Sequence, residues 1–282
     1  MSPPLIGTLD VPGASIYYER RGTGPTLLLI STGNGDAAPF TPLAERLAKH
    51  YTVVTYDRRG YSRSPLRGPL DDERHLDDDI DDARRLLDHV SAEPGYVAGT
   101  CSGAIVALGL AARFPDRVRL LVAHEPPSVS VLPDAAHWLK VHQQLYDTYR
   151  TEGIEAARDA FRDYAGLGDT RPPPGAELPP EQLAQLLARL KPNQVFWFEH
   201  ELLTYPAYVP DAEALRSLGD RLVLAGGTTS RDHFSCRPTV VLAEQIGAAL
   251  HLFPGSHVGH VTHPYEYADE LLRVLGGDRS AG

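Results

Sequence analysis

Short apolar runs bounded by turn residues recur along the chain and predict buried strands. These runs lie at residues 26–30, 51–56, 95–98, 118–123, 221–225 and 249–253. Runs of this length without strict alternation are typical of strands that are buried on both faces, as in parallel sheets. Residues 14–20 are predicted to add an antiparallel strand at one edge of the sheet.

Amphipathic patterns between these runs predict helices. One stripe of apolar residues repeats at steps of three and four, with Asp and Arg on the opposite face: Leu76, Ile80, Ala83, Leu87 and Val90. Residues 105–112 give a second apolar stripe, which ends at Pro115. Strands that alternate with helices predict an α/β fold whose sheet is mostly parallel and covered by helices on both faces.

The alternation stops between residues 133 and 212, where the pattern is helical throughout. Helical stripes occur at 138–149, 156–164 and 183–190, and a last helix is predicted at 194–203. We therefore expect a core of residues 1–132 and 213–282, with residues 133–212 inserted as a helical cap. A cap above a binding site presents an apolar underside, so Trp138, Tyr146 and Trp197 are expected to line the pocket.

Composition and charge narrow the class of protein. A formal net charge of −10 and an isoelectric point near 5.6 argue against a nucleic-acid or anionic-membrane partner. The sequence contains no apolar run long enough for a membrane span and no secretory signal pattern. Cys101 and Cys236 are too few for a secreted disulfide framework. These features predict a cytoplasmic protein with free thiols.

The twelve histidines invite a search for metal ligands. His257, His260 and His263 recur every third residue, but neither Cys-x-x-Cys nor His-Glu-x-x-His accompanies them. We therefore predict no metal site and no cofactor.

The segment 95–106 carries the most specific motif of the chain. A short apolar run leads into Gly99-Thr100-Cys101-Ser102-Gly103 and then into a helical pattern. This arrangement resembles the nucleophile elbow of the α/β hydrolases, in which serine usually holds the central position. Glycines are expected beside the nucleophile because neighbouring backbone leaves no room for a Cβ.

The resemblance implies that Cys101 is the nucleophile. A thiol is partly ionised near neutral pH, and a helix N-terminus and a nearby imidazole lower its pKa further. The alternative is a buried cysteine that only fills apolar space. Ser102 is not central in the glycine frame, and we interpret it as the donor of one backbone N–H to an oxyanion.

The C-terminal part of the chain also resembles this family. Its members end in a strand, a loop with the catalytic histidine, a proline seven residues later and a final helix. His257 and Pro264 have that separation, which implies that His257 is the base. His260 and His263 are interpreted as pocket or helix-start residues.

Two carboxylates are candidates for the acid that orients His257. Asp232 lies in the loop after the run at 221–225, where most family members carry their acid. Glu125 follows the run at 118–123 in the sequence Ala-His-Glu-Pro-Pro, which resembles a subset of the family with the acid at this earlier place. We favour Glu125 and keep Asp232 as the alternative.

Residues 31–36 follow the first buried run, where family members usually carry His-Gly-x. By this resemblance the N–H groups of Asn34 and Ser102 are expected to form the oxyanion hole. Residues 56–64 resemble the Asp-x-Arg-Gly-x-Gly-x-Ser loop of the family and are interpreted as structural.

The resemblance covers nearly all of residues 14–275 and implies an eight-stranded type of sheet with an inserted helical cap. A Cys–His–Glu set predicts an acyl-cysteine intermediate formed from a small-molecule acyl substrate, free or presented on a carrier protein. With water as acceptor, the enzyme is a thioesterase or esterase. With a carbanion of the acyl chain as acceptor, it is a Dieckmann-type cyclase of natural-product biosynthesis. A third hypothesis is a ligand-binding homologue without turnover.

Overall fold

A computed structural model describes residues 3–168 and 170–277 of the chain. Within these residues, eight strands form one sheet in the order β1-β2-β4-β3-β5-β6-β7-β8. The strands are β1 (Leu5–Val11), β2 (Ala14–Arg21), β3 (Thr26–Ile30), β4 (Thr52–Tyr56), β5 (Gly95–Thr100), β6 (Val118–His124), β7 (Leu222–Gly227) and β8 (Leu250–Phe253). β3 to β8 pair in parallel, whereas β2 pairs antiparallel with both β1 and β4. The predicted α/β fold with a mostly parallel sheet is confirmed.

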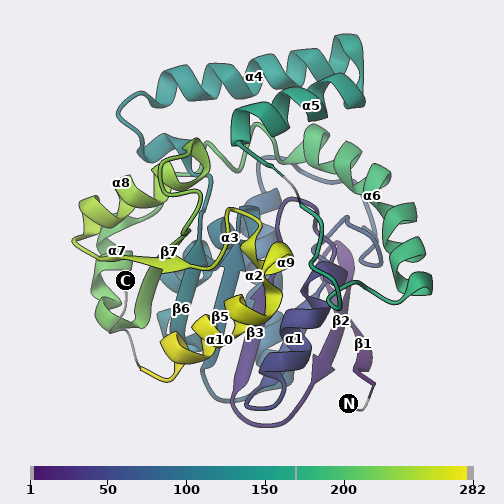
Figure 1. Ribbon diagram of the computed structural model, residues 1–282, viewed down its shortest axis with the longest axis vertical. Coiled ribbons are helices and arrows are strands. Elements are labelled where there is room, and N and C mark those ends of the chain that lie inside the picture. The colour runs from purple at the N-terminus through teal and green to yellow at the C-terminus, as the bar shows by residue number, and fades with distance from the viewer. Residues whose placement is uncertain (1–2, 169, 278–282) are drawn as a thin grey trace.

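Helices cover both faces of the sheet (Figure 1). They are α1 (Thr41–Leu47), α2 (His75–Val90), α3 (Ser102–Arg113), α4 (Ala135–Glu152), α5 (Ile154–Ala165), α6 (Pro180–His200), α7 (Ala212–Ser217), α8 (Arg237–Ile246), α9 (Gly259–Thr262) and α10 (Pro264–Leu275). Short 3₁₀ turns lie at Ala38–Phe40, Pro115–Arg117, Val129–Val131, Gly219–Arg221 and Phe234–Cys236. The helices α2, α3, α7 and α8 pack on one face, and α1 and α10 pack on the other.

The strand β3 shows why the central runs lack polar alternation. Leu28 and Ile30 belong to the core beneath α2 and α3, while Leu27 and Leu29 belong to the core beneath α1 and α10. Successive side chains of a strand point to opposite faces, so a strand covered on both sides needs apolar residues throughout.

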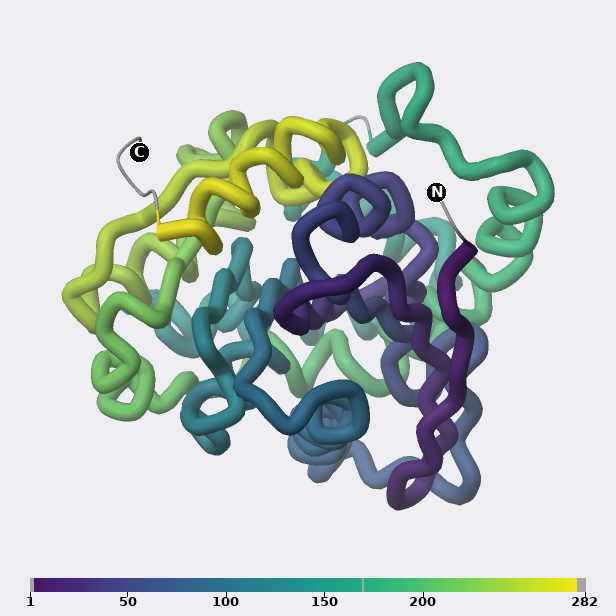
Figure 2. Tube along the Cα trace, turned by 90° about the horizontal axis from the view of Figure 1, so that it is seen from below, coloured from purple at the N-terminus to yellow at the C-terminus, as the bar shows by residue number. Residues whose placement is uncertain are grey.

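The N-terminal edge differs from the prediction. The edge strand is β1, which the sequence pattern did not reveal, and β2 lies between β1 and β4. Figure 2 shows the β1–β2 hairpin in purple along the outer side of the sheet. Leu5 and Ile6 are exposed, so β1 lacks the apolar run that marks the buried strands. The turn at Pro12-Gly13, where Gly13 has φ +79°, is the local signal that predicts a hairpin here.

Helices α4, α5 and α6 follow β6 and precede β7, and they lie at the top and right of Figure 1. Leu145 of α4, Ala157 of α5 and Phe198 of α6 form a separate small core. The structure has one helix over Pro180–His200 where the sequence pattern predicted two, and Pro192 lies inside it. Among the described residues, no helix has both the length and the apolar character needed to span a membrane.

Candidate active site

Cys101 lies at a sharp corner between β5 and α3. Its backbone has φ 55° and ψ −127°. Residues other than glycine rarely adopt this conformation, which costs about 1–3 kcal/mol. A Cβ at Gly103 would lie closer than 3.0 Å to the carbonyl oxygens of Ser31 and Ile30, and one at Gly99 would meet the Gly103 carbonyl as closely. Gly103 therefore allows the corner to pack against the end of β3, and Gly99 allows the start of α3 to pack against β5.

Glu125 follows β6 directly and is completely buried, with φ +47°. The His257 Nδ1–H donates to Glu125 Oε2 at 2.7 Å. The other carboxylate oxygen, Oε1, accepts from the Gly227 N–H at 2.8 Å and from the Ser230 hydroxyl. Asp232, the alternative acid, is exposed in the loop after β7. The structure thus brings Glu125 to His257 and leaves Asp232 at the surface.

Cys101 and His257 share a side-chain hydrogen bond, and each shifts the pKa of the other. Burial raises the pKa of the Cys101 thiol, but the charge and hydrogen bond of His257 outweigh burial and lower it overall. Burial lowers the pKa of His257, whereas the Cys101 thiolate and the Glu125 carboxylate raise it to about 10. An imidazole is protonated below its pKa and a thiol is ionised above its pKa. The Cys101 thiolate and the His257 imidazolium therefore stabilise each other.

The same environment controls Glu125. Burial raises the pKa of this carboxyl, but the hydrogen bond and positive charge of His257 lower it well below its usual range. Glu125 therefore stays ionised and holds the His257 ring with Nε2 free to face Cys101.

Two backbone N–H groups approach the Cys101 sulfur, and they differ in part from the prediction. Those of Ser102 and Gly33 donate to it and contribute to its lowered pKa. The Asn34 N–H donates instead to Thr32 Oγ1 at 3.2 Å. The tight turn in which the Gly35 N–H bonds the Thr32 carbonyl at 2.9 Å directs the Asn34 N–H away from the sulfur. Gly33 and Ser102 thus supply the N–H groups beside the sulfur, while Asn34, the predicted oxyanion donor, lines the cavity with its N–H bonded to Thr32.

A cavity of about 510 Å³ opens above Cys101 and His257. Its apolar lining comes from the α5–α6 region and the His257 loop: Phe161, Leu167, Leu190, Trp197, Phe198 and Val258. Its polar lining includes Thr32, Asn34, Gln194, Thr170, Arg158 and Arg162. This arrangement suits an acyl group held over the sulfur by an apolar surface.

Of the three aromatic residues predicted to line the pocket, Trp197 does so and the other two do not. Trp138 packs on Phe234 with ring centroids 3.9 Å apart, and its indole N–H bonds Asp134 at 3.0 Å. Tyr146 packs beside Tyr149. Both belong to α4, which packs on α5 and away from this cavity. Phe161 and Leu190 also line the cavity but were not predicted. An apolar stripe shows that a helix is amphipathic, but it does not show which helix lies next to the cavity.

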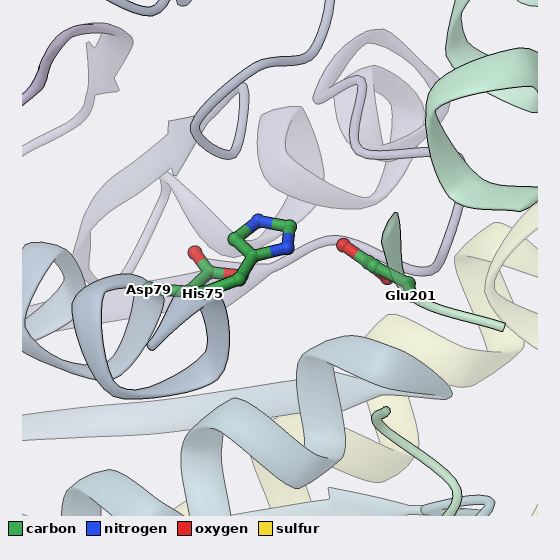
Figure 3. Close-up of side chains that lie close together, drawn as sticks. All are labelled: His75, Asp79 and Glu201. Atoms are coloured by element: carbon green, nitrogen blue, oxygen red, sulfur yellow. The ribbon is translucent and has the colours of Figure 1, made fainter. Parts of the chain in front are cut away.

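A second polar cluster lies between α2 and the end of α6 (Figure 3). Ligand atoms of His75, Asp79 and Glu201 lie within 4.8 Å of one another, close enough to hold a metal ion. However, the fully buried Arg58 donates to Asp79 at 2.8 Å and to both carboxylate oxygens of Glu201. A divalent cation here would lie against a buried guanidinium, where like charges repel strongly. The donor set fits an ion-pair network better than a metal site.

The matching family model and the most similar relatives are all hydrolases. Residues 25–162 match the family model of the alpha/beta hydrolase fold. The uncharacterized hydrolase YraK of Bacillus subtilis is 35% identical over 273 residues, which are 95% of each chain. A zearalenone hydrolase of Bionectria ochroleuca is 28% identical over 95% of this chain and 96% of that protein.

Solved structures show the same fold. A carboxylesterase structure from Nitrososphaera gargenis has a TM-score of 0.73 at 22% identity, covering 96% of this chain and 98% of that one. An alpha/beta hydrolase of Sphaerobacter thermophilus has a TM-score of 0.65 at 25% identity, covering 95% of this chain and all of that one.

Proposed function

The chain belongs to the α/β hydrolase fold family, and on this premise we propose that it is an acyl-transfer enzyme with a Cys101–His257–Glu125 triad. The proposed reaction is hydrolysis of a thioester or ester of a small acyl compound, free or presented on a carrier protein. The observation that carries this proposal is the arrangement of Cys101 and His257 beneath one cavity, with the His257 Nδ1–H bonded to Glu125 at 2.7 Å.

The proposed reaction begins with attack of the Cys101 thiolate on the acyl carbonyl carbon. The oxygen of the tetrahedral intermediate accepts hydrogen bonds from the Gly33 and Ser102 N–H groups. The bond to the leaving oxygen or sulfur then breaks, and His257 gives its proton to that atom. Water next attacks the acyl-cysteine while His257 accepts a proton. The free acid leaves, and the thiolate–imidazolium pair is restored.

Dieckmann-type cyclisation is the second candidate, and the apolar lining of the cavity favours it. Six apolar side chains line part of the space above the sulfur, and where they exclude water a carbon nucleophile within the acyl chain is favoured as the acceptor. The acyl-cysteine would then be released as a cyclic product with no water consumed.

Intact-mass spectrometry tests the proposal. The protein is mixed with p-nitrophenyl esters, N-acetylcysteamine thioesters and zearalenone, the compound named for two relatives. An acyl adduct on Cys101 with release of the free acid supports hydrolysis. A product lighter than that acid by one water supports cyclisation. A protein that forms neither adduct nor product, although Cys101 is readily alkylated, would be a ligand-binding homologue.

The two cysteines should react very differently with iodoacetamide. At pH 7 we expect Cys101 to be alkylated at least about 50-fold faster than Cys236, as measured by peptide mass spectrometry. Burial and the neighbouring Glu125 raise the pKa of Cys236 to about 12, whereas that of Cys101 is lowered. As pH falls from 8 to 6, the Cys101 rate should drop less than that of free cysteine. Equal rates for the two thiols would contradict the ion pair.

The acid has a matched pair of variants. Glu125→Gln should lower the rate of Cys101 acylation about 10- to 100-fold, because a neutral amide no longer stabilises the imidazolium. Asp232→Asn makes the same chemical change at an exposed site and should stay within about twofold of wild type. Stopped-flow release of p-nitrophenol measures both rates. A larger loss in Asp232→Asn would reverse the assignment.

A further inference from the structure

One face of α6 lies along the loop that contains the proposed oxyanion donor. Arg189, Asn193 and Trp197 are spaced by four residues, and Glu201 continues the stripe as the residue that caps the helix. Residues four apart lie on the same face of a helix. We call residues 32–36 the oxyanion loop. Each member of the α6 stripe reaches this loop, directly or through one residue.

The first half of the stripe holds the outer part of the oxyanion loop. Arg189 Nε donates to Asp36 Oδ2 at 2.7 Å. Asn193 is buried, and its Nδ2 donates to the Asn34 carbonyl at 2.9 Å and to the Ser62 hydroxyl at 2.8 Å. The Asn193 side-chain carbonyl accepts from the Ser62 N–H at 3.1 Å. Asn193 thus ties the oxyanion loop to the loop after β4.

The second half of the stripe reaches the donor itself. A Cβ at Gly33 would lie 2.5 Å from the indole nitrogen of Trp197, so only glycine fits beneath this ring. Glu201 binds the guanidinium of Arg58, and Arg58 Nη1 donates to the Thr32 carbonyl at 3.1 Å. The Arg58 backbone N–H also donates to the Gly35 carbonyl at 2.9 Å.

The contact with Thr32 matters because its carbonyl and the Gly33 N–H belong to the same peptide group. A peptide group is planar, so a partner that fixes the carbonyl also fixes the direction of the N–H. A charged donor on the carbonyl oxygen also polarises the amide and strengthens the N–H as a donor. Arg58 therefore acts on the proposed oxyanion donor through one rigid unit.

We propose that α6 sets the oxyanion hole through three positioning residues. Arg58, held by Glu201, acts through the Thr32–Gly33 peptide, and Asn193 holds the same loop through the Asn34 carbonyl. This inference rests on the proposed function, because an oxyanion hole is useful only to acyl transfer. It gives the loop at residues 56–64 a role in the chemistry. It also makes acyl transfer depend on the cap, since displacement of α6 releases the Gly33 N–H.

The test needs variants that keep the fold. Removal of one partner from a buried ion pair is strongly destabilising, so alanine at Arg58 or Glu201 is unsuitable. Glu201→Gln keeps the side-chain size, leaves one acceptor oxygen for Arg58, and keeps Asp79 to balance the Arg58 charge. Asn193→Leu removes the bond to the Asn34 carbonyl at similar volume. Glu199→Gln is the matched control, because Glu199 is exposed on the same helix and bonds Tyr149.

Three measurements separate positioning from general damage. Acylation of Cys101 by p-nitrophenyl acetate should fall about 10- to 100-fold in Glu201→Gln and Asn193→Leu, with little change in KM. Alkylation of Cys101 by iodoacetamide needs no oxyanion donor, so its rate should change much less than the acylation rate and by no more than the loss of one N–H donor to the sulfur allows. The amide resonance of Gly33 should shift in both variants before any ester is added. Glu199→Gln should resemble wild type in all three.

Unchanged acylation, a parallel loss of alkylation, or an unmoved Gly33 resonance would each overturn the inference. If the wild-type protein is not acylated at all, the proposed function fails on its own. The Gly33 resonance then decides: a shift in the two variants but not in Glu199→Gln supports the positioning by α6, and no shift rejects it.

Discussion

His257→Ala should lower the rate of acyl transfer to Cys101 by about 10³-fold or more. The imidazolium stabilises the thiolate, and it is the proton donor to the leaving group in the proposed reaction. Alanine removes both contributions, and the thiol pKa rises because burial then acts without an opposing charge. Stopped-flow acylation with p-nitrophenyl acetate at pH 7 measures the loss, and circular dichroism checks that the variant is folded.

The control for this variant is His263→Ala. His263 is exposed and pairs with the Thr262 hydroxyl, so its loss should change the rate by less than about twofold. His260 is a poor control because it is buried against Phe40 and Tyr267. Alanine there should lower stability by creating a cavity. Acylation at a near-wild-type rate in His257→Ala would remove His257 from the triad.

Gly103→Ala should destabilise the protein by about 3 kcal/mol or more. The added Cβ would lie closer than 3.0 Å to two backbone carbonyl oxygens, that of Ile30 in β3 and that of Ser31 just after it. Backbone atoms of a central strand cannot rotate away as a flexible side chain can, so the cost should lie at or beyond the upper end of overpacking effects. Urea unfolding monitored by tryptophan fluorescence gives the difference in the free energy of unfolding.

Gly68→Ala is the matched comparison. Gly68 is exposed, and an added Cβ there meets nothing within 4 Å. Its free energy of unfolding should stay within about 0.5 kcal/mol of wild type. Similar losses in the two variants would show that the elbow is not the sterically restricted corner described above.

How well each strand could be predicted from the sequence depended on how completely helices cover it. Strands covered on both faces are mostly apolar without alternation, and for that reason β3 to β8 were visible in the sequence. The strand β1 was missed because one face is exposed to solvent and its apolar residues do not form a run. The single helix α6 was split in the prediction because the stripes on either side of Pro192 were read separately.

Some residues of the candidate site could be recognised from their neighbours in the sequence, whereas the placement of others depends on residues far away in the chain. Cys101 was recognisable because a strand, a glycine frame and a helix occur within a few consecutive residues. His257 was recognisable from its distance to Pro264. Glu125 was favoured over Asp232 from the local sequence Ala-His-Glu-Pro-Pro, but its contact with His257 is seen only in the structure, because the two residues are 132 positions apart. The bond of the Asn34 N–H to Thr32 Oγ1 was not foreseen, and it leaves the N–H groups of Gly33 and Ser102 beside the sulfur.

The family resemblance, the parallel sheet and the position of the thiol could be read from residue types alone, because each depends on patterns within short segments of the chain. The tertiary structure decided which carboxylate meets His257, which N–H faces the sulfur and which cap residues line the cavity. Those choices depend on the direction of side chains and peptide groups, and residues far away in the chain set that direction. The contact of Arg58 with the Thr32 carbonyl shows this most clearly, since the residues that hold Arg58 come from α2 and from the end of α6.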